Sequence, residues 1–208
     1  MAARLLVIDT ATIACSVALF EDGDLLASHY AEIGRGHAEK LVPAIAELPG
    51  RGKAENILVN CGPGSFTGVR IGIATATALA LAWGSEVHGY NCLALVAAQA
   101  QAGLDAPQSV CVAMAAGHGE YFVQNFSAAG QALGAFLTLQ PDQAADQVRA
   151  DLIVGTAAAD LGLAMGVDTH FSILPNAVHA PLVHGDMKKM PAKPVYGRKP
   201  DAQPAIKS

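Results

Sequence analysis

The stretch NCGPGSFTGVRIG, residues 60–72, lies between an apolar run and an Ala-rich segment, where a phosphate-binding loop would lie. Its glycines follow the pattern G-x-G-x-x-x-G, which is one residue longer than a dinucleotide-binding loop. A P-loop would place lysine after the last glycine, but Val69 stands there and Arg70 is the only nearby cation. The spacing therefore gives only weak support to a phosphate site.

The same stretch has the residue types of a structural loop that leads into a helix. Pro63 stiffens it, Ser65 or Thr67 can cap the helix, and Phe66 is expected to pack on the core. The predicted loop comprises Gly62, Pro63, Gly64, Ser65, Phe66 and Thr67.

The helix predicted after this loop, residues 68–83, is apolar on nearly every side. Gly68, Gly72, Ala76 and Ala80 recur every four residues and form a ridge with almost no side chain, which permits a close approach by another helix. Such a helix is either buried in its own fold or docked on a partner.

The four cysteines form no C-x-x-C pair, and the seven histidines form neither H-x-x-x-H nor H-E-x-x-H. Three of the cysteines lie in strand-like runs, which is typical of buried, reduced thiols. An autonomous metal site is therefore not expected.

The elements that would position these residues follow one order twice. In the first half we expect strands at 5–8, 13–20 and 25–30, a helix at 36–48, a strand at 57–61, the helix at 68–83, a strand at 87–90 and a helix at 93–102. An Asp22-Gly23 turn joins the second and third strands. The second half gives strands at 110–115, 120–126 and 131–139, a helix at 142–150 and a strand at 152–154.

Two βββαβα units predict the duplicated α/β plan of the actin/Hsp70/sugar-kinase superfamily, whose lobes resemble ribonuclease H. We divide the chain into a lobe at 1–103, a smaller lobe at 104–190 and a basic, Pro-rich tail at 191–208. In that superfamily, a carboxylate after the first strand of each lobe helps hold magnesium beside ATP. Asp9 has that place in the first lobe, but Ala11 replaces the expected glycine and Ala115 replaces the second carboxylate. We therefore expect a degenerate nucleotide site in which Asp9 caps backbone donors.

Composition limits the classes of protein to consider. The chain has 208 residues, 52% hydrophobic and 15% charged, which suits a folded protein with a sizeable core. We expect no apolar run to be long enough to cross a membrane and find no signal-peptide pattern, so we expect a cytosolic protein. Residues 185–208 hold six basic and two acidic side chains, whereas the whole chain has a net charge of −5. We interpret this tail as solvated.

Three stretches carry a resemblance to a known family. They read LLVIDTATIACSVAL (5–19), HAEKLVP (37–43) and CGPGSFTGVRIG (61–72), and PVYGRKPDA (194–202) adds a fourth near the end. Together they closely resemble the TsaB (YeaZ) family of bacterial tRNA-modification proteins. The resemblance is strong over residues 4–102 and patchy over 103–193.

The resemblance implies a non-catalytic, actin-like subunit with no cofactor of its own. In the family, the related subunit TsaD carries the metal and the active site, and TsaE is an ATPase. The complex uses ATP and Mg²⁺ and transfers threonylcarbamoyl to N6 of the tRNA adenosine beside the anticodon. The implied partners are therefore TsaD, TsaE, tRNA through the complex, and a second copy in a homodimer, with no membrane.

The resemblance also implies that the two helices of the first lobe contact TsaD, with the Gly/Ala ridge docking a foreign helix. On that view Gly68→Val or Gly72→Leu abolishes pairing in a monomer that stays folded. The residues expected at this interface are His37, Glu39, Leu41, Ile45, Gly68, Arg70, Ile71, Gly72, Thr75, Ala76 and Leu79.

Two other classes stay open. An independent actin-like ATPase or kinase would use Asp9 with magnesium, and the absence of a carboxylate at Ala115 argues against it. A peptidase has no support from the residues, since His37 and Glu39 are two apart on a helix and point to different faces.

Overall fold

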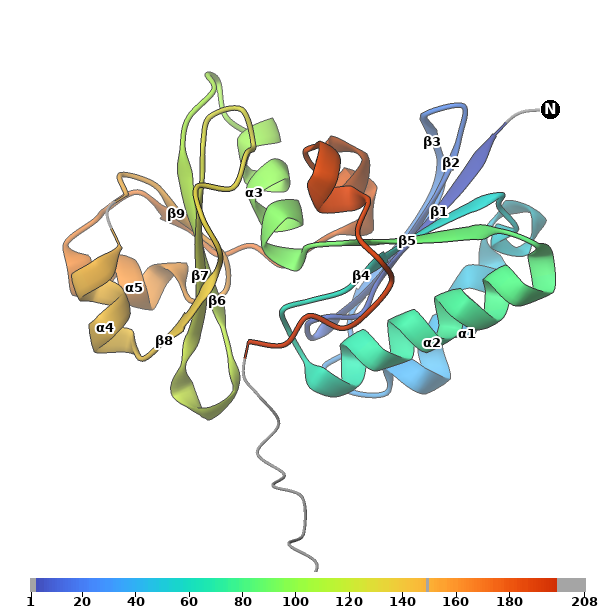
Figure 1. Ribbon diagram of the computed structural model, residues 1–208, viewed down its shortest axis with the longest axis horizontal. Coiled ribbons are helices and arrows are strands. Elements are labelled where there is room, and N and C mark those ends of the chain that lie inside the picture. Colours follow the sequence, from blue (N-terminus) through green and yellow to red (C-terminus); the bar gives the residue numbers. More distant parts are fainter. Residues whose placement is uncertain (1–2, 149, 198–208) are drawn as a thin grey trace, which may run out of the picture.

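The computed structural model describes residues 3–148 and 150–197 as two α/β lobes side by side (Figure 1). The first lobe contains β1 (Arg4–Asp9), β2 (Ala14–Glu21), β3 (Asp24–Glu32), α1 (His37–Glu47), β4 (Asn56–Asn60), α2 (Phe66–Trp83), β5 (Glu86–Tyr90) and α3 (Cys92–Ala102). The second contains β6 (Val110–Ala115), β7 (Tyr121–Phe126), β8 (Leu137–Leu139), α4 (Pro141–Gln147), β9 (Ile153–Val154), α5 (Ala158–Met165) and β10 (His170–Phe171).

Both lobes have the same sheet topology. The strand order is β3-β2-β1-β4-β5 in the first and β8-β7-β6-β9-β10 in the second. In each sheet the first three strands along the chain are antiparallel, and the two later strands run parallel to the first. The duplicated plan expected from the sequence is therefore confirmed. The predicted Asp22-Gly23 turn is also present, with φ of 51° and 95°.

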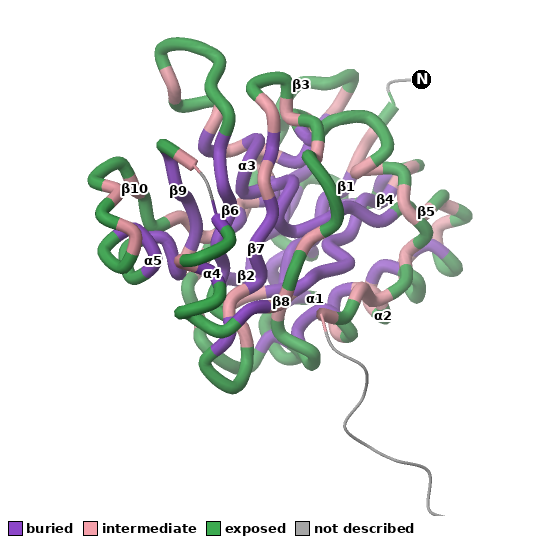
Figure 2. Tube along the Cα trace, turned by 60° about the vertical axis from the view of Figure 1, so that its left-hand side comes forward, coloured by how far each residue is buried: buried purple, intermediate pink, exposed green. Residues whose placement is uncertain are grey.

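The first sheet is covered on both faces, which explains why nearly all of β2 is buried (Figure 2). Cys15, Val17 and Leu19 pack on the side of α1 and α2, whereas Ala18 and Phe20 pack on the side of α3. This matches the alternation predicted for the strand.

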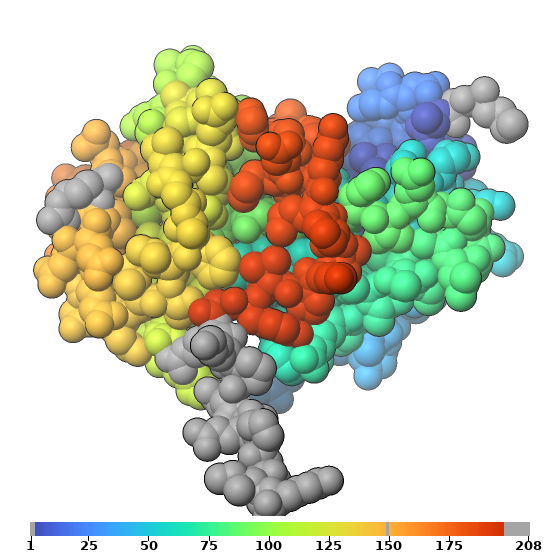
Figure 3. Space-filling model, viewed as in Figure 1, coloured from blue at the N-terminus to red at the C-terminus, as the bar shows by residue number. Residues whose placement is uncertain are grey.

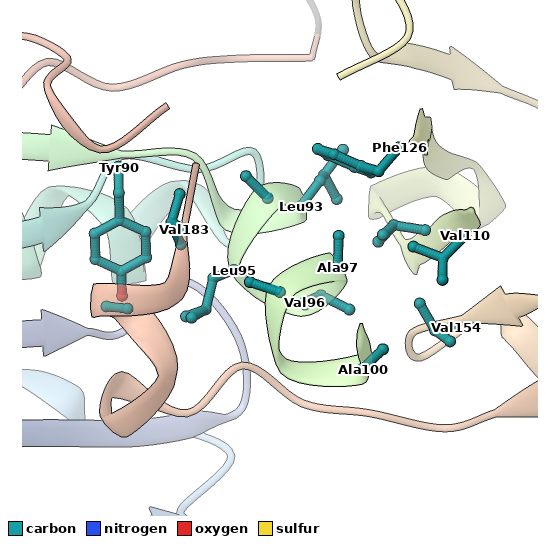
Figure 4. Packing of buried hydrophobic residues seen from close by; sticks show 14 of the residues in the cluster. Tyr90, Leu93, Leu95, Val96, Ala97, Ala100, Val110, Phe126, Val154 and Val183 are labelled. Atoms are coloured by element: carbon teal, nitrogen blue, oxygen red, sulfur yellow. The ribbon is translucent and has the colours of Figure 1, made fainter. Parts of the chain in front are cut away.

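Helix α3 lies between the two lobes and joins their cores. In Figure 4 the side chains of α3 lie between Tyr90 of β5, in the first lobe, and Val110 of β6 and Val154 of β9, in the second. On the other face of the second sheet, α4 and α5 cover β6, β7 and β9. The lobes therefore share one continuous apolar cluster.

Two predicted elements of the second lobe are wrong in extent. The strand expected at 131–139 is reduced to β8, because Gly134 has a φ of 116° that interrupts the extended run. The helix expected to end at residue 150 ends at Gln147, and Val148 is extended. Residue 149 lies outside the described residues.

After β10 the chain returns to the first lobe, so the boundary drawn at residue 190 does not coincide with where the backbone leaves the second sheet. The 3₁₀ helix η3 (Ala177–Leu182) packs on β1, β2 and α3, and η4 (Gly185–Lys188) lies beside β5. Figure 3 shows this segment, in red, filling the space between the lobes.

We call residues 189–197 the C-terminal strap. Met190 pairs with Gly89 of β5, and the amide of Val195 donates to the carbonyl of Cys61 at 2.7 Å. In the second lobe, Thr138 donates to the carbonyl of Gly197 at 3.0 Å. The part of the predicted solvated tail before residue 198 is therefore packed, and residues 198–208 lie outside the described residues.

Candidate functional site

The small-residue ridge of α2 faces the chain's own sheet. Gly68, Gly72, Ala76 and Ala80 are all buried, and α2 packs mainly on β4. A Cβ on Gly68 would overlap the carbonyl oxygen of Thr10, and one on Gly72 would lie 2.6 Å from the Thr10 hydroxyl. The interpretation of the ridge as a surface for a foreign helix is therefore wrong. The close approach it permits is to Thr10, whose hydroxyl donates to the carbonyl of Gly68 at 2.7 Å.

The residues expected at the interface divide into three groups. Buried within the lobe are His37, Leu41, Ile45, Gly68, Gly72 and Ala76; half-buried are Ile71, Thr75 and Leu79; exposed are Glu39 and Arg70. The His37 ring lies 3.2 Å from the carbonyl of Ala14 while Glu39 faces solvent, so the two point to different sides as predicted. Only the last two groups have surface to offer a partner.

A different side of α2 is both apolar and exposed. We define the α2 outer face as Ala74, Thr77, Ala78 and Leu81, all exposed, with Leu81 at 88%. Val42 on the neighbouring α1 is 52% exposed. Spacings of three and four place the four residues along one side of the helix, away from the ridge.

Helix α2 is long and apolar enough to cross a membrane when only its length and composition are considered. That finding is weak, since the core helix of a globular fold passes the same test. Here the ridge packs closely on Thr10, Ile8 and Val59 of the first sheet, which is the environment of such a helix. A core helix is usually mostly buried, whereas only 28% of the 18 residues of α2 are buried, so the rest of its apolar surface is at least partly exposed.

The loop before α2 is held by hydrogen bonds at each end. The Gly62 amide donates to the Asn60 side chain at 2.7 Å, and the Ser65 amide donates to the carbonyl of Ala11 at 2.7 Å. The Ser65 hydroxyl accepts from the Gly68 amide at 3.2 Å, which confirms it as the N-cap. Gly62 has a φ of 95°, and Gly64 lies against Ala11 too closely to carry a Cβ. The loop is therefore built against the turn that follows β1.

Phe66 does not pack on the core, which corrects the prediction for it. Its side chain is 53% exposed, and the Arg70 guanidinium lies 3.6 Å from its ring centroid. Tyr196 of the strap completes the group: its ring centroid is 5.3 Å from that of Phe66, and its hydroxyl accepts a hydrogen bond from Arg70 Nε at 2.9 Å. We call these three residues the Phe66–Arg70–Tyr196 cluster.

Asp9 is buried at the end of β1 and accepts three hydrogen bonds. The donors are the Ala11 amide at 3.1 Å, Asn60 Nδ2 at 2.6 Å and the Tyr90 hydroxyl at 2.7 Å. The predicted capping of a backbone donor is therefore confirmed. Asn60 and Tyr90 end β4 and β5, so the carboxylate joins the ends of three neighbouring parallel strands.

Burial raises the pKa of Asp9 from 3.8 to about 6, because desolvation of the carboxylate outweighs the hydrogen bonds from Tyr90, Asn60 and Ala11. The pKa of Tyr90 is raised as well, by its own burial and then by the neighbouring Asp9 charge. The pair therefore favours a neutral Tyr90 that donates to Asp9.

The Asp9 pKa predicts a pH dependence of stability. A folded-state pKa above the unfolded one stabilises the fold below pH 4, and that contribution is lost as the pH rises through about 6. A shift of roughly two units corresponds to about 3 kcal/mol. Urea unfolding between pH 4 and pH 7 should therefore show a larger loss of unfolding free energy for the wild type than for Asp9→Asn. Equal pH profiles for the two proteins would contradict this.

A cavity of about 500 Å³ lies between the lobes, and we call it the interlobe cavity. The first lobe contributes Ala11, Thr12, Ile13, Gly34, Pro63, Gly64, Ser65 and Phe66, and the second lobe and the chain after it contribute Met114, Ala115, Ala116, Gly117, Phe122, Thr156 and Leu174. None of these lining residues is charged. The polar side chains among them are the hydroxyls of Thr12, Ser65 and Thr156.

The residues present do not fit the magnesium–ATP site of the actin-like superfamily. Asp9 is 1% exposed and its oxygens already accept hydrogen bonds, and the Ala115 amide donates to Thr156 at 2.9 Å where a second carboxylate was expected. In the described residues, no group of three or more His, Cys, Asp or Glu could hold a metal ion. The four cysteines are buried and free.

Comparison with protein families and solved structures gives consistent results. A family model described as TsaD, tRNA N6-adenosine threonylcarbamoyltransferase, matches residues 30–178. The tRNA threonylcarbamoyladenosine biosynthesis protein TsaB of Escherichia coli K12 is 45% identical over 83 residues, which is 38% of this chain and 36% of that protein. The match thus spans about a third of this curated relative's length.

Two solved structures from Pseudomonas aeruginosa resemble nearly the whole chain. One, described as an uncharacterized protein similar to peptidase YeaZ, is 30% identical with a TM-score of 0.79, covering 94% of this chain and all of that one. The other, YeaZ itself, is 29% identical with a TM-score of 0.79, covering 93% and 99%.

Proposed function

Since the chain belongs to the TsaB (YeaZ) family, we propose that it is a non-catalytic scaffold subunit of the complex that transfers threonylcarbamoyl to N6 of the tRNA adenosine beside the anticodon. The proposed direct partner is TsaD, which would supply the active site. TsaE would be a further member, tRNA would be bound through the complex, and ATP and Mg²⁺ would be used by the other subunits. The proposed location is the cytoplasm.

The observation that carries the proposal is the α2 outer face. Leu81 is 88% exposed, and Ala74 and Ala78 extend the apolar strip along an ordered helix that is anchored to its own sheet by the opposite side. Exposed apolar strips on rigid elements favour docking of another apolar element. The proposed occupant is an apolar helix of TsaD, and a second copy of this chain is the alternative outcome.

The proposal that this protein is not itself catalytic is supported by the hydrogen bonds that Asp9 accepts. A carboxylate whose oxygens accept from Ala11, Asn60 and Tyr90 is unavailable to a hard cation without breaking those bonds. None of the residues that line the interlobe cavity is charged. Asp9 therefore has the geometry of a structural residue.

Depletion of this protein in its host, followed by mass spectrometry of tRNA nucleosides, tests the proposal. Threonylcarbamoyladenosine should fall and should be restored both by the wild type and by Asp9→Asn, whose folded state is checked by thermal melting. The purified wild type should turn over no ATP above the buffer rate. Magnesium-dependent turnover that Asp9→Asn abolishes would instead establish an independent ATPase.

A further inference from the structure

The Phe66–Arg70–Tyr196 cluster is not needed to explain docking through the α2 outer face. It stands at the start of α2, where Phe66 is 53% and Tyr196 is 39% exposed. Two partly exposed aromatic rings beside a guanidinium form an apolar surface with a positive charge at its edge. The cluster is therefore suited to bind a ligand that has both a flat ring and a negative charge.

Among the described residues, no carboxylate neutralises the charge of Arg70. In the part of the chain that the structure describes, its one hydrogen bond is from Nε to the Tyr196 hydroxyl, and no carboxylate lies within ion-pair distance. Arg70 therefore offers a cation at the surface of a chain whose net charge is −5.

The cluster also borders a space of suitable size. Phe66 forms part of the lining of the interlobe cavity, whose volume of about 500 Å³ is within the range of small-molecule pockets. The lining also includes the apolar side chains of Met114 and Phe122, and the hydroxyls of Ser65 and Thr156 offer hydrogen bonds. An uncharged, flat, heteroaromatic group fits this lining better than a phosphate does.

We propose that the interlobe cavity takes one unpaired base of a single-stranded RNA segment, with Phe66 as its stacking wall and Arg70 at the adjoining phosphate. The inference deepens the proposed function, on which the choice of RNA as the source of the base rests. Stacking on aromatic rings beside a positive groove is the general way in which proteins hold unpaired nucleotides.

Contacts within the chain hold the three residues of the cluster together. Arg70 lies on an ordered helix, and Tyr196 is held by strap contacts on either side, from the Val195 amide to Cys61 and from Thr138 to Gly197. The strap thus brings an aromatic ring from the chain's end to a cation 126 residues earlier. Preorganisation of this kind lowers the cost of binding.

The test uses the full chain and a fluorescently labelled oligoadenylate in anisotropy titrations at two salt concentrations. Phe66→Leu should weaken binding by about tenfold with an unchanged salt dependence, because it removes a stacking surface and no charge. Arg70→Gln should weaken binding and lower the slope of log affinity against log salt by about 0.7, the value for one phosphate contact on a single strand.

Arg51→Gln is the matched control, since it removes the same charge from the connection before β4, at the opposite end of that strand from the loop. Its binding should equal that of the wild type apart from a small general charge effect. Equal affinities for Phe66→Leu and wild type, or equal losses for Arg51→Gln and Arg70→Gln, would overturn the base site in favour of non-specific attraction of a polyanion.

Two further arms identify the source of the base and separate this inference from the proposed function. AMP should compete only weakly, and competition by AMP as strong as that by oligoadenylate would replace RNA with a free nucleotide. TsaD is titrated against the same variants. If RNA does not bind and Phe66→Leu weakens TsaD binding, the cluster is a protein contact; if RNA does not bind while TsaD binding is normal, only the RNA inference fails.

Discussion

Replacing Gly72 by leucine is expected to destabilise the first lobe by at least about 3 kcal/mol, because the new side chain has no space between α2 and the sheet. A Cβ alone would lie 2.6 Å from the Thr10 hydroxyl and 3.5 Å from Val59. That hydroxyl already donates to the carbonyl of Gly68, so it cannot turn away without losing a buried hydrogen bond. Chemical denaturation followed by circular dichroism measures the change.

Ala74→Leu is the control for Gly72→Leu, since Ala74 lies two residues further along the same helix and is exposed. Its unfolding free energy should stay within about 0.5 kcal/mol of wild type. A Gly72→Leu protein as stable as Ala74→Leu would mean that the ridge does not pack on Thr10 in solution. The result also bears on the expectation that Gly72→Leu abolishes pairing with TsaD. If the first lobe of this variant is unfolded, a loss of pairing gives no information on the interface.

The second large effect is expected at the α2 outer face. Leu81→Asp should lower the unfolding free energy by only about 1 kcal/mol, because the side chain is 88% exposed and the cost comes from an acid in the last turn of α2. It should weaken binding to TsaD by about 2 kcal/mol or more, roughly 30-fold, because the complex would bury an unpaired carboxylate. Isothermal titration calorimetry with purified TsaD gives the affinity.

Leu163→Asp provides the comparison at the other lobe. Leu163 lies on α5 and is 83% exposed, so the two substitutions remove the same exposed side chain and add the same charge. Leu163→Asp should bind TsaD as the wild type does. Loss of binding with Leu163→Asp and not with Leu81→Asp would move the proposed interface to the second lobe.

Local features of the site could be predicted from the sequence because their partners are close along the chain. The Ser65 cap joins residues three apart, and the Asp22-Gly23 turn joins consecutive strands. The sequence predicts that Asp9 caps backbone donors, and the donor that the structure shows is the Ala11 amide, two residues away. The other two donors to Asp9 are Asn60 and Tyr90. Predicting them requires the order of the parallel strands in the sheet, although each is a polar residue at the end of an apolar run and is a candidate on that ground.

The direction of the small-residue ridge could not be predicted from spacing alone. A period of four places Gly68 and Gly72 on one side of α2, but a helix that is apolar all round has no polar face to mark the outside. The exposure of Leu81 cannot be predicted from the sequence for the same reason. The contact between Arg70 and Tyr196 joins residues 126 apart, and no local pattern could indicate it.

The most direct test of the scaffold account is the threonylcarbamoyladenosine content of bulk tRNA in a host depleted of this protein and supplied with Leu81→Asp or Leu163→Asp at equal abundance. The account predicts that Leu163→Asp restores the modified nucleoside to the wild-type level and that Leu81→Asp does not. Full restoration by Leu81→Asp, or no fall in the nucleoside on depletion, would contradict it.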